Sequence, residues 1–69
     1  MGNIFQVFGN NVKHRRKELS LSQEDLADAI ERDPRTIRLI EAGTSNPTMK
    51  TVFKLSKALK TTATQLLAF

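Results

Sequence analysis

The middle of the chain carries side chains that could contact a nucleic acid from one side of a helix. On a helical wheel the apolar side of this segment is narrow, and Arg35, Arg38 and Leu39 lie roughly opposite to it. Arginine can donate two hydrogen bonds to guanine in the major groove of DNA, and leucine can contact a thymine methyl group. The pattern alone fits two interpretations: a base-reading helix, or a solvated helix with one exposed leucine.

Helix signals bound this segment at both ends. Asp33 can cap the start of a helix, and Pro34 suits its first position, where the missing backbone N–H removes no hydrogen bond. Gly43 suits the left-handed residue that follows a helix. We therefore expect a helix over 34–42.

A second short helix should precede it directly. Ser22 is a good N-cap, and Asp25 stands three residues later, where a carboxylate can complete a capping box. We expect this helix to span 23–30. Because only about three residues then join the two helices, they must cross steeply, as they do in helix-turn-helix units.

The rest of the chain also has helical periodicity, and no stretch alternates as a half-buried strand does. The sequence therefore predicts an all-α fold, a compact bundle of about five short helices in one domain over 1–69. The three remaining helices are expected at 8–19, 49–59 and 63–68. The apolar positions expected to face the core in the first and fourth helices are Phe5, Phe8, Val12, Leu19, Met49, Val52, Leu55 and Leu59.

Two charged residues fall on or beside apolar helix faces. Arg16 lies within the apolar stripe of the first helix, and Glu41 borders that of the third. Burying either charge alone would be unfavourable, whereas a bidentate arginine–carboxylate pair satisfies both groups. We expect this pair to tie the two helices together. The alternative is that Arg16 lays its stem on the core and extends its charge to solvent.

Composition limits the classes of function. A chain of 69 residues supports a single core and leaves little room for a deep substrate cleft. The chain has no cysteine, and its only histidine, His14, is expected at the surface without a second ligand. We therefore expect no metal site, no cofactor and no catalytic residue. Eleven Lys and Arg against seven Asp and Glu give a net charge of +4, which suits a phosphate polyanion.

The sequence also bears on cellular location. No apolar run approaches the roughly 20 residues of a membrane span. The start of the chain, including Met1–Gly2, lacks the features of a secretion signal and of a myristoylation motif. We expect a cytoplasmic protein without a membrane partner.

Several of these segments occur together in a known family. The second helix carries Ser-Gln-Glu-Asp-Leu-Ala over 22–27, and the third ends in Ile40-Glu41, followed by Gly43 and Asn46-Pro47. With this spacing the chain resembles the XRE/Cro-like helix-turn-helix family (lambda-repressor-like) over about residues 8–67. Further matching residues are Phe8-Gly9, Val12, Arg16, Leu21, Thr36-Ile37 and Leu55 through Leu59. The resemblance implies a five-helix bundle that binds double-stranded DNA in the major groove as a dimer and regulates transcription, as a repressor.

The resemblance also implies roles by position. Base contacts are implied for Asp33, Pro34, Arg35, Thr36, Arg38 and Leu39. Phosphate contacts are implied for Ser22, Gln23, Thr44, Ser45, Asn46 and Lys50, the last four in the loop after the third helix. Gln23 is further implied to brace the recognition helix with its side chain. Arg16 and Glu41 match the interhelical ion pair of the family.

This chain departs from the family pattern near the helix ends. Family members commonly carry Gly at the positions of Ser20 and Glu31, so both residues must tolerate a conformation that favours glycine. Arg32 replaces the apolar residue that usually follows in the turn. Pro34 has no polar side chain, which reduces the first base-reading position to shape or methyl contact.

The sequence leaves alternative partners. Some small members of the family are antitoxins, whose main partner is a protein toxin. The expected partners are a DNA operator and a second copy of the chain, and a toxin is the alternative. The apolar tail over 66–69 could serve a dimer or a toxin, or it could close the core through Leu66. A scaffold that no longer binds DNA is the third alternative.

Overall fold

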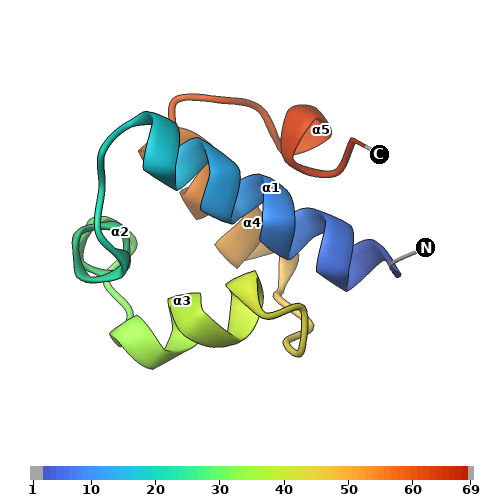
Figure 1. The fold of residues 1–69 in the computed structure, drawn as a ribbon, viewed down its shortest axis with the longest axis horizontal. Coiled ribbons are helices and arrows are strands. Elements are labelled where there is room, and N and C mark those ends of the chain that lie inside the picture. The colour runs from blue at the N-terminus through green and yellow to red at the C-terminus, as the bar shows by residue number, and fades with distance from the viewer. Residues whose placement is uncertain (1–2, 69) are drawn as a thin grey trace.

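The computed structural model describes residues 3–68, which form five α-helices and no strand. The described residues do not include Met1, Gly2 and Phe69. The expectations for the start of the chain and for the end of the apolar tail rest partly on these three. The helices pack into an all-α bundle, as expected, with both ends of the chain on one side (Figure 1). Their bounds are Ile4–Glu18 for α1, Gln23–Ala29 for α2, Pro34–Glu41 for α3, Met49–Ala58 for α4 and Ala63–Leu66 for α5.

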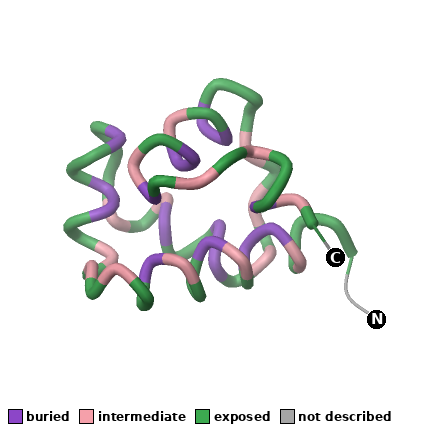
Figure 2. The backbone as a smooth tube through the Cα atoms, turned by 90° about the horizontal axis from the view of Figure 1, so that it is seen from above, coloured by how far each residue is buried: buried purple, intermediate pink, exposed green. Residues whose placement is uncertain are grey.

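One apolar core holds the helices together. Buried residues recur along the helices at helical spacing (Figure 2). Because helices of this length are marginal on their own, their stability comes mainly from the shared core. The buried apolar residues are Phe8, Val12, Leu26, Ala27, Ile30, Ile37, Ile40, Val52, Leu55, Leu59 and Leu66.

Side chains at the helix starts accept hydrogen bonds from backbone N–H groups that have no partner within the helix. The Ser22 hydroxyl accepts from the Asp25 N–H at 2.9 Å, and the Asp25 carboxylate accepts from the Ser22 N–H at 2.9 Å, which completes the predicted capping box. The hydrogen bonds from Ser22, first from its backbone and then from its side chain, lower the pKa of Asp25. Thr48 and Thr62 cap α4 and α5 with their hydroxyls.

α1 begins at Ile4 and not at Phe8, where the sequence analysis started it. Asn3 caps this earlier start, since its side chain accepts from the Gln6 N–H at 2.9 Å and its own N–H donates to the Gln6 side chain at 3.0 Å. The spacing of Asn3 and Gln6 is itself a capping-box signal. The start at residue 8 was placed from apolar periodicity, without use of this signal. The inward position expected for Phe5 is wrong, because the first turn of α1 extends past the core and leaves this side chain 37% exposed.

The C-terminal half differs from the expectation in two places. Met49 was expected to face the core but is 60% exposed, because it lies on the first turn of α4, outside the buried side formed by Val52 and Leu55. α5 ends at Leu66 and not at residue 68. At the other four helix ends, the last residue of each expected range is the C-cap of the helix.

Four helices end in the same type of turn, in which one residue adopts a left-handed conformation. After α3 this residue is Gly43, with φ of 76°. After α1, α2 and α4 it is Ser20, Glu31 and Lys60, with φ of 58°, 58° and 54°. At the end of α2, the N–H groups of Glu31 and of the next residue donate to carbonyls in the last turn at 3.1 and 2.9 Å. Ser20 and Glu31 therefore occupy glycine-type positions, as the family resemblance implies.

Replacing Glu31 with glycine should stabilise the fold. The left-handed conformation costs an L-residue about 1–2 kcal/mol, whereas glycine loses about 0.5–1 kcal/mol more conformational entropy on folding. We expect Glu31→Gly to raise the free energy of unfolding by up to about 1 kcal/mol, measured by thermal unfolding. Glu31→Ala is the control, because it removes the charge but keeps the strained backbone. An equal gain in both variants would contradict the strain argument.

The turn between α2 and α3 sets a steep crossing. α2 is seen end-on in Figure 1 and lengthwise at the left of Figure 2, whereas α3 runs across the view in Figure 1. Asp33 closes the turn, since its carboxylate accepts from the Arg35 N–H at 2.8 Å and Pro34 then starts the helix. The two helices therefore form the steep unit that the short connection predicts.

Candidate nucleic-acid interface

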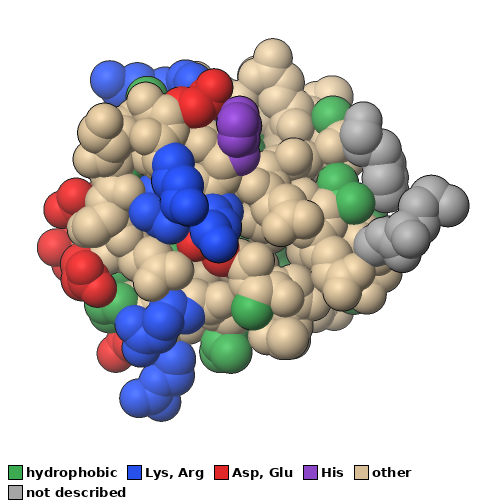
Figure 3. All heavy atoms as spheres, in the orientation of Figure 1, with side chains coloured by type: hydrophobic (Ala, Val, Ile, Leu, Met, Phe, Trp, Pro, Cys, Tyr) green, Lys and Arg blue, Asp and Glu red, His purple; other side chains and the backbone are tan. Residues whose placement is uncertain are grey.

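α3 exposes a basic face to solvent. Ile37 and Ile40 are buried in the core, whereas Arg35 and Arg38 are exposed and Leu39 is 47% exposed. Neither arginine forms an ion pair with a residue between 3 and 68. Figure 3 shows basic side chains projecting at the lower left, over the N-terminal half of α3, with acidic side chains above them over α2. This face therefore offers two guanidinium groups and an apolar side chain to a partner.

The first turn of α3 offers fewer polar groups. The Asp33 carboxylate is already engaged as the helix cap, and Pro34 and Thr36 are half-buried. Arg32, just before the cap, is exposed and has no ion pair within residues 3–68. Sequence analysis treated it only as a departure from the usual turn. In the structure it adds an exposed positive charge in the turn directly before α3.

A buried ion pair ties α3 to α1. Arg16 and Glu41 are each 8% exposed, and Arg16 donates from Nε to Oε2 at 2.7 Å and from Nη2 to Oε1 at 3.1 Å. Its Nη1 donates to the Leu21 carbonyl at 2.8 Å. The hydrogen bond to Glu41, helped by charge attraction, raises the pKa of Arg16 although burial acts in the opposite direction. Arg16 therefore pairs with Glu41 and does not extend its charge to solvent.

Gln23 joins α2 to the same network. Its Nε2 donates to Oε1 of Glu41 at 3.1 Å, the same oxygen that accepts from Arg16. Every buried side-chain nitrogen and oxygen of residues 3–68 has a hydrogen-bond partner. Because one carboxylate joins three helices, the network limits how α3 can rotate against α1 and α2. This contact is the bracing that the family resemblance implies for Gln23.

The residues expected at DNA phosphates lie on three elements around α3. Ser22 is the N-cap of α2 and Gln23 is its first residue. Residues 44–46 follow α3, and Lys50 is exposed on the first turn of α4. The assignment of Lys50 to the loop is therefore wrong, because Thr48 already caps α4. Thr44 donates from its N–H and its hydroxyl to a carbonyl in the last turn of α3, both at 3.2 Å, which holds the start of the loop.

α1 and α3 approach so closely at Gly9 that no side chain fits between them. A Cβ atom at this position would lie 2.1 Å from the carbonyl oxygen of Ile40 and 3.2 Å from that of Glu41. Both are backbone atoms of α3 and cannot rotate away. Gly9 therefore sets the distance between the helix with the basic face and the rest of the core.

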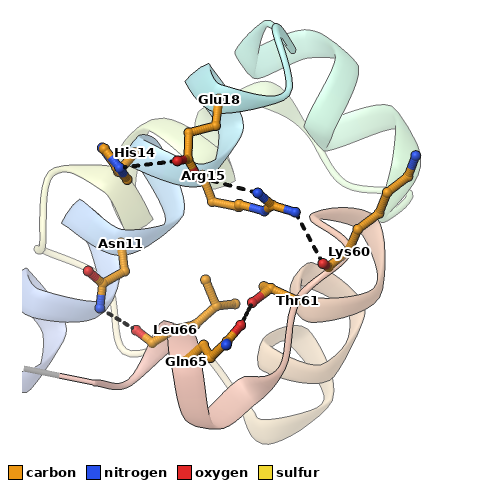
Figure 4. Close-up of a pocket in the computed structure, with 8 residues that line it drawn as sticks. All are labelled: Asn11, His14, Arg15, Glu18, Lys60, Thr61, Gln65 and Leu66. Carbon is orange, nitrogen blue, oxygen red and sulfur yellow. Dashed lines mark hydrogen bonds and ion pairs between the residues drawn. The ribbon is translucent and has the colours of Figure 1, made fainter.

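Two residues of α1 that sequence analysis did not single out hold the C-terminal helices. Arg15 donates from Nε to the Leu59 carbonyl at 2.8 Å and from Nη2 to the next carbonyl at 3.2 Å. Asn11 donates from Nδ2 to the Leu66 carbonyl at 2.8 Å. Figure 4 shows both side chains pointing from α1 toward the ends of α4 and α5. Their spacing of four residues indicates a shared face of α1 but names no partner.

Other kinds of site are not formed by the described part of the chain. Residues 3–68 contain no group of three His, Cys, Asp or Glu side chains placed to hold a metal ion. None of their helices combines the length and the apolar character needed to cross a bilayer. His14 is exposed, and its Nε2 lies 3.6 Å from a Glu18 carboxylate oxygen.

Known proteins share both the sequence pattern and the geometry. The profile of a family described as helix-turn-helix matches residues 12–66. The HTH-type transcriptional regulator DicA from Escherichia coli (strain K12) is 37% identical over 61 residues. This match covers 88% of the chain and 45% of DicA, so the chain spans less than half the length of this curated relative.

Solved structures share the fold. The hypothetical transcription factor NHTF from Neisseria superposes with a TM-score of 0.91 at 27% identity, over 96% of this chain and 76% of that protein. The restriction-modification controller protein C.AhdI from Aeromonas hydrophila superposes with a TM-score of 0.86 at 29% identity, over 90% of this chain and 94% of C.AhdI. With its capped α2–α3 unit, its Arg16–Glu41 pair and these matches, the chain belongs to the XRE/Cro-like helix-turn-helix family.

Proposed function

We propose that this protein binds double-stranded DNA by placing α3 in the major groove and that it regulates transcription. The observation that carries this proposal is the exposed face of α3, whose arginines have no ion pair within residues 3–68. Reading of bases requires side chains that project from a fixed backbone. The buried network of Arg16, Gln23 and Glu41 supplies that rigidity. The regulators to which the chain is similar support the same function.

The base-reading roles follow from the chemistry of the exposed face. Arg35 and Arg38 can each donate two hydrogen bonds to O6 and N7 of a guanine, and Leu39 can pack against a thymine methyl group. Asp33 and Pro34 contribute less, because the Asp33 carboxylate already caps α3 and the Pro34 side chain is apolar. Thr36 is half-buried and reaches a base or a phosphate only from the edge of the face.

Phosphate contacts would hold the helix in register on the duplex. We assign them to Ser22 and Gln23 at the start of α2, to Thr44, Ser45 and Asn46 after α3, and to Lys50 on α4. These residues come before and after α3 along the chain. A net charge of +4 strengthens the attraction to DNA at low salt.

Selection of bound DNA from a random pool tests the proposed function directly. A chain that reads bases through α3 should enrich a defined motif, and a homodimer should enrich it as two half-sites. We propose that the protein represses transcription, because a domain that occupies an operator blocks access of other proteins to the same DNA. Failure to enrich any motif, with the protein folded, would refute sequence-specific binding.

Arg35→Ala should weaken binding to the selected site roughly 5- to 150-fold. A bidentate arginine–guanine contact contributes about 1–3 kcal/mol, and its loss should also relax the preference at one base position. Fluorescence anisotropy with the selected site and its single-base variants measures both effects. Lys17→Ala is the matched control, because it removes one exposed positive charge from α1. Unchanged affinity and preference in Arg35→Ala would contradict the assignment of the reading face.

Lys50→Ala should weaken binding to all sequences alike. A phosphate contact carries no base preference, and each one contributes about 1 to the slope of log affinity against log salt concentration. The measurement is affinity over a salt series for the selected site and for a scrambled duplex. Lys57→Ala, about two turns further along α4, should leave the slope unchanged. A loss of affinity confined to the selected site would show that Lys50 reads bases instead.

A further inference from the structure

The turn between α2 and α3 carries one exposed positive charge within an acidic stretch of the chain. Arg32 is the only Lys or Arg from residue 18 to residue 34, whereas the same stretch contains six Asp and Glu residues. Arg32 is exposed, and it forms no ion pair within residues 3–68 although Glu31 and Asp33 flank it. Family members usually carry an apolar residue at this position, so the resemblance assigns no contact to Arg32. Its guanidinium is therefore available to a partner outside the chain.

The backbone on both sides of Arg32 is held by hydrogen bonds. Its own N–H donates to the Ala27 carbonyl at 2.9 Å, which closes the end of α2. The Asp33 carboxylate then accepts from the Arg35 N–H at 2.8 Å, which starts α3. Because the Arg32 side chain projects from a fixed point, a contact that it makes loses less conformational entropy than one from a mobile loop. Figure 1 shows this turn at the N-terminal end of α3, away from both ends of the chain.

The start of α3 has no backbone donor left for a phosphate. Helix N-termini commonly bind phosphate groups through N–H groups that have no partner within the helix. Here Pro34 has no N–H, and the Arg35 N–H already donates to the Asp33 carboxylate. The Thr36 N–H donates to the Asp33 carbonyl at 2.9 Å. A phosphate at this end of α3 must therefore be bound by a side chain.

We propose that Arg32 binds a DNA phosphate beside the N-terminal end of α3, an inference that rests on the proposed function. In helix-turn-helix complexes the first helix of the unit crosses the DNA backbone and the second lies in the major groove. The turn that joins them therefore lies where the backbone borders the groove. A guanidinium can donate two parallel hydrogen bonds to a phosphate. In this position Arg32 also offsets the negative charges of Glu31 and Asp33, which repel DNA.

Arg32→Ala should weaken binding to the selected site and to a scrambled duplex by the same factor, roughly 5- to 20-fold at low salt. The slope of log affinity against log salt concentration should fall by about 1, and the base preference should not change. Fluorescence anisotropy over a salt series, with single-base variants of the site, measures all three quantities. Arg32→Lys should keep the slope because it keeps the charge. Lys57→Ala is the matched control for the loss of an exposed charge on another helix.

Uncharged linkages in the DNA locate the contact. In a set of duplexes with the selected site, one phosphate at a time is replaced by a methylphosphonate, which carries no charge. At the phosphate that Arg32 binds, this replacement should weaken binding of the wild-type chain but should not weaken binding of Arg32→Ala any further, as in a double-mutant cycle. At phosphates bound by other residues, the replacement should weaken binding of both chains alike.

Three results would overturn this contact while the proposed function stands, because in each the wild-type chain still binds its selected site. The first is an Arg32→Ala chain with the affinity and salt slope of Lys57→Ala. The second is a changed preference at one base position, which would show that Arg32 reads a base. The third is a set of uncharged linkages that all weaken both chains alike, which would show only long-range attraction. A wild-type chain that binds no selected site would instead refute the proposed function, and this contact with it.

Discussion

Gly9→Ala is expected to destabilise the protein by at least about 3 kcal/mol, although alanine is the better helix former by about 1 kcal/mol. The added Cβ would lie 2.1 Å from the Ile40 carbonyl oxygen, so the conflict is between one helix backbone and another. To relieve it, α1 and α3 would have to separate by about one ångström, and a close-packed core transmits such a shift to its neighbours. The packing loss therefore exceeds the gain in helix propensity.

Urea unfolding followed by circular dichroism measures this loss. A domain of 69 residues has on the order of 3–10 kcal/mol of stability, so the loss is a large fraction of the total and should move the unfolding midpoint to clearly lower urea concentration. The matched control is Asn10→Ala, an exposed neighbour on the same helix, which should change stability by no more than about 0.5 kcal/mol. A loss below about 1 kcal/mol in Gly9→Ala would mean that α3 can move away at little cost.

Glu41→Ala should cost about 3–5 kcal/mol, because it leaves the Arg16 guanidinium buried without its partner. The same substitution removes the acceptor of the Gln23 amide, so α3 loses its polar ties to both α1 and α2. We expect the variant to unfold at lower urea concentration. Any folded fraction should bind DNA more weakly, since α3 is less firmly oriented. A loss under about 1 kcal/mol would show that the pair is dispensable.

A double substitution separates the loss of the pair from the burial of an unpaired charge. Arg16→Met combined with Glu41→Leu replaces both groups by apolar side chains of similar size, and such replacements of buried ion pairs are often close to neutral. We expect the double variant to be more stable than Glu41→Ala alone. If the double variant were the less stable of the two, the unpaired guanidinium would not be the cause of the instability of Glu41→Ala.

Much of the fold could be predicted because helix boundaries depend on hydrogen bonds within a few residues. Ser22 with Asp25 and the Asp33–Pro34 pair start α2 and α3 where the sequence predicts. The start of α1 was missed because apolar periodicity was given more weight than the cap formed by Asn3 and Gln6. In both cases residues close in sequence carried enough information to place the helix start. For α1 the capping residues were not used.

The degree of burial could not be predicted from a helical wheel. Met49 falls on the apolar stripe of its helix but is 60% exposed, because a wheel gives the direction of a side chain and not the extent of the neighbouring helices. The same limit hides that Ile4, Phe5 and Met49 line one cavity, since the first turns of α1 and α4 come together only in the fold. Which exposed apolar residues are neighbours is a property of the fold.

The sequence by itself determined the two-helix unit, the outward face of α3 with Arg35, Arg38 and Leu39, and the place of two opposite charges on or beside inward helix faces. These follow from helical periodicity and from capping over three or four residues. Only the tertiary structure decided that Gln23 shares the carboxylate of Glu41, that Arg15 holds the end of α4 and that Gly9 lies against the backbone of Ile40. These contacts join residues 18 to 44 positions apart in the sequence, so no local pattern specifies them, and their geometry follows from how the core packs.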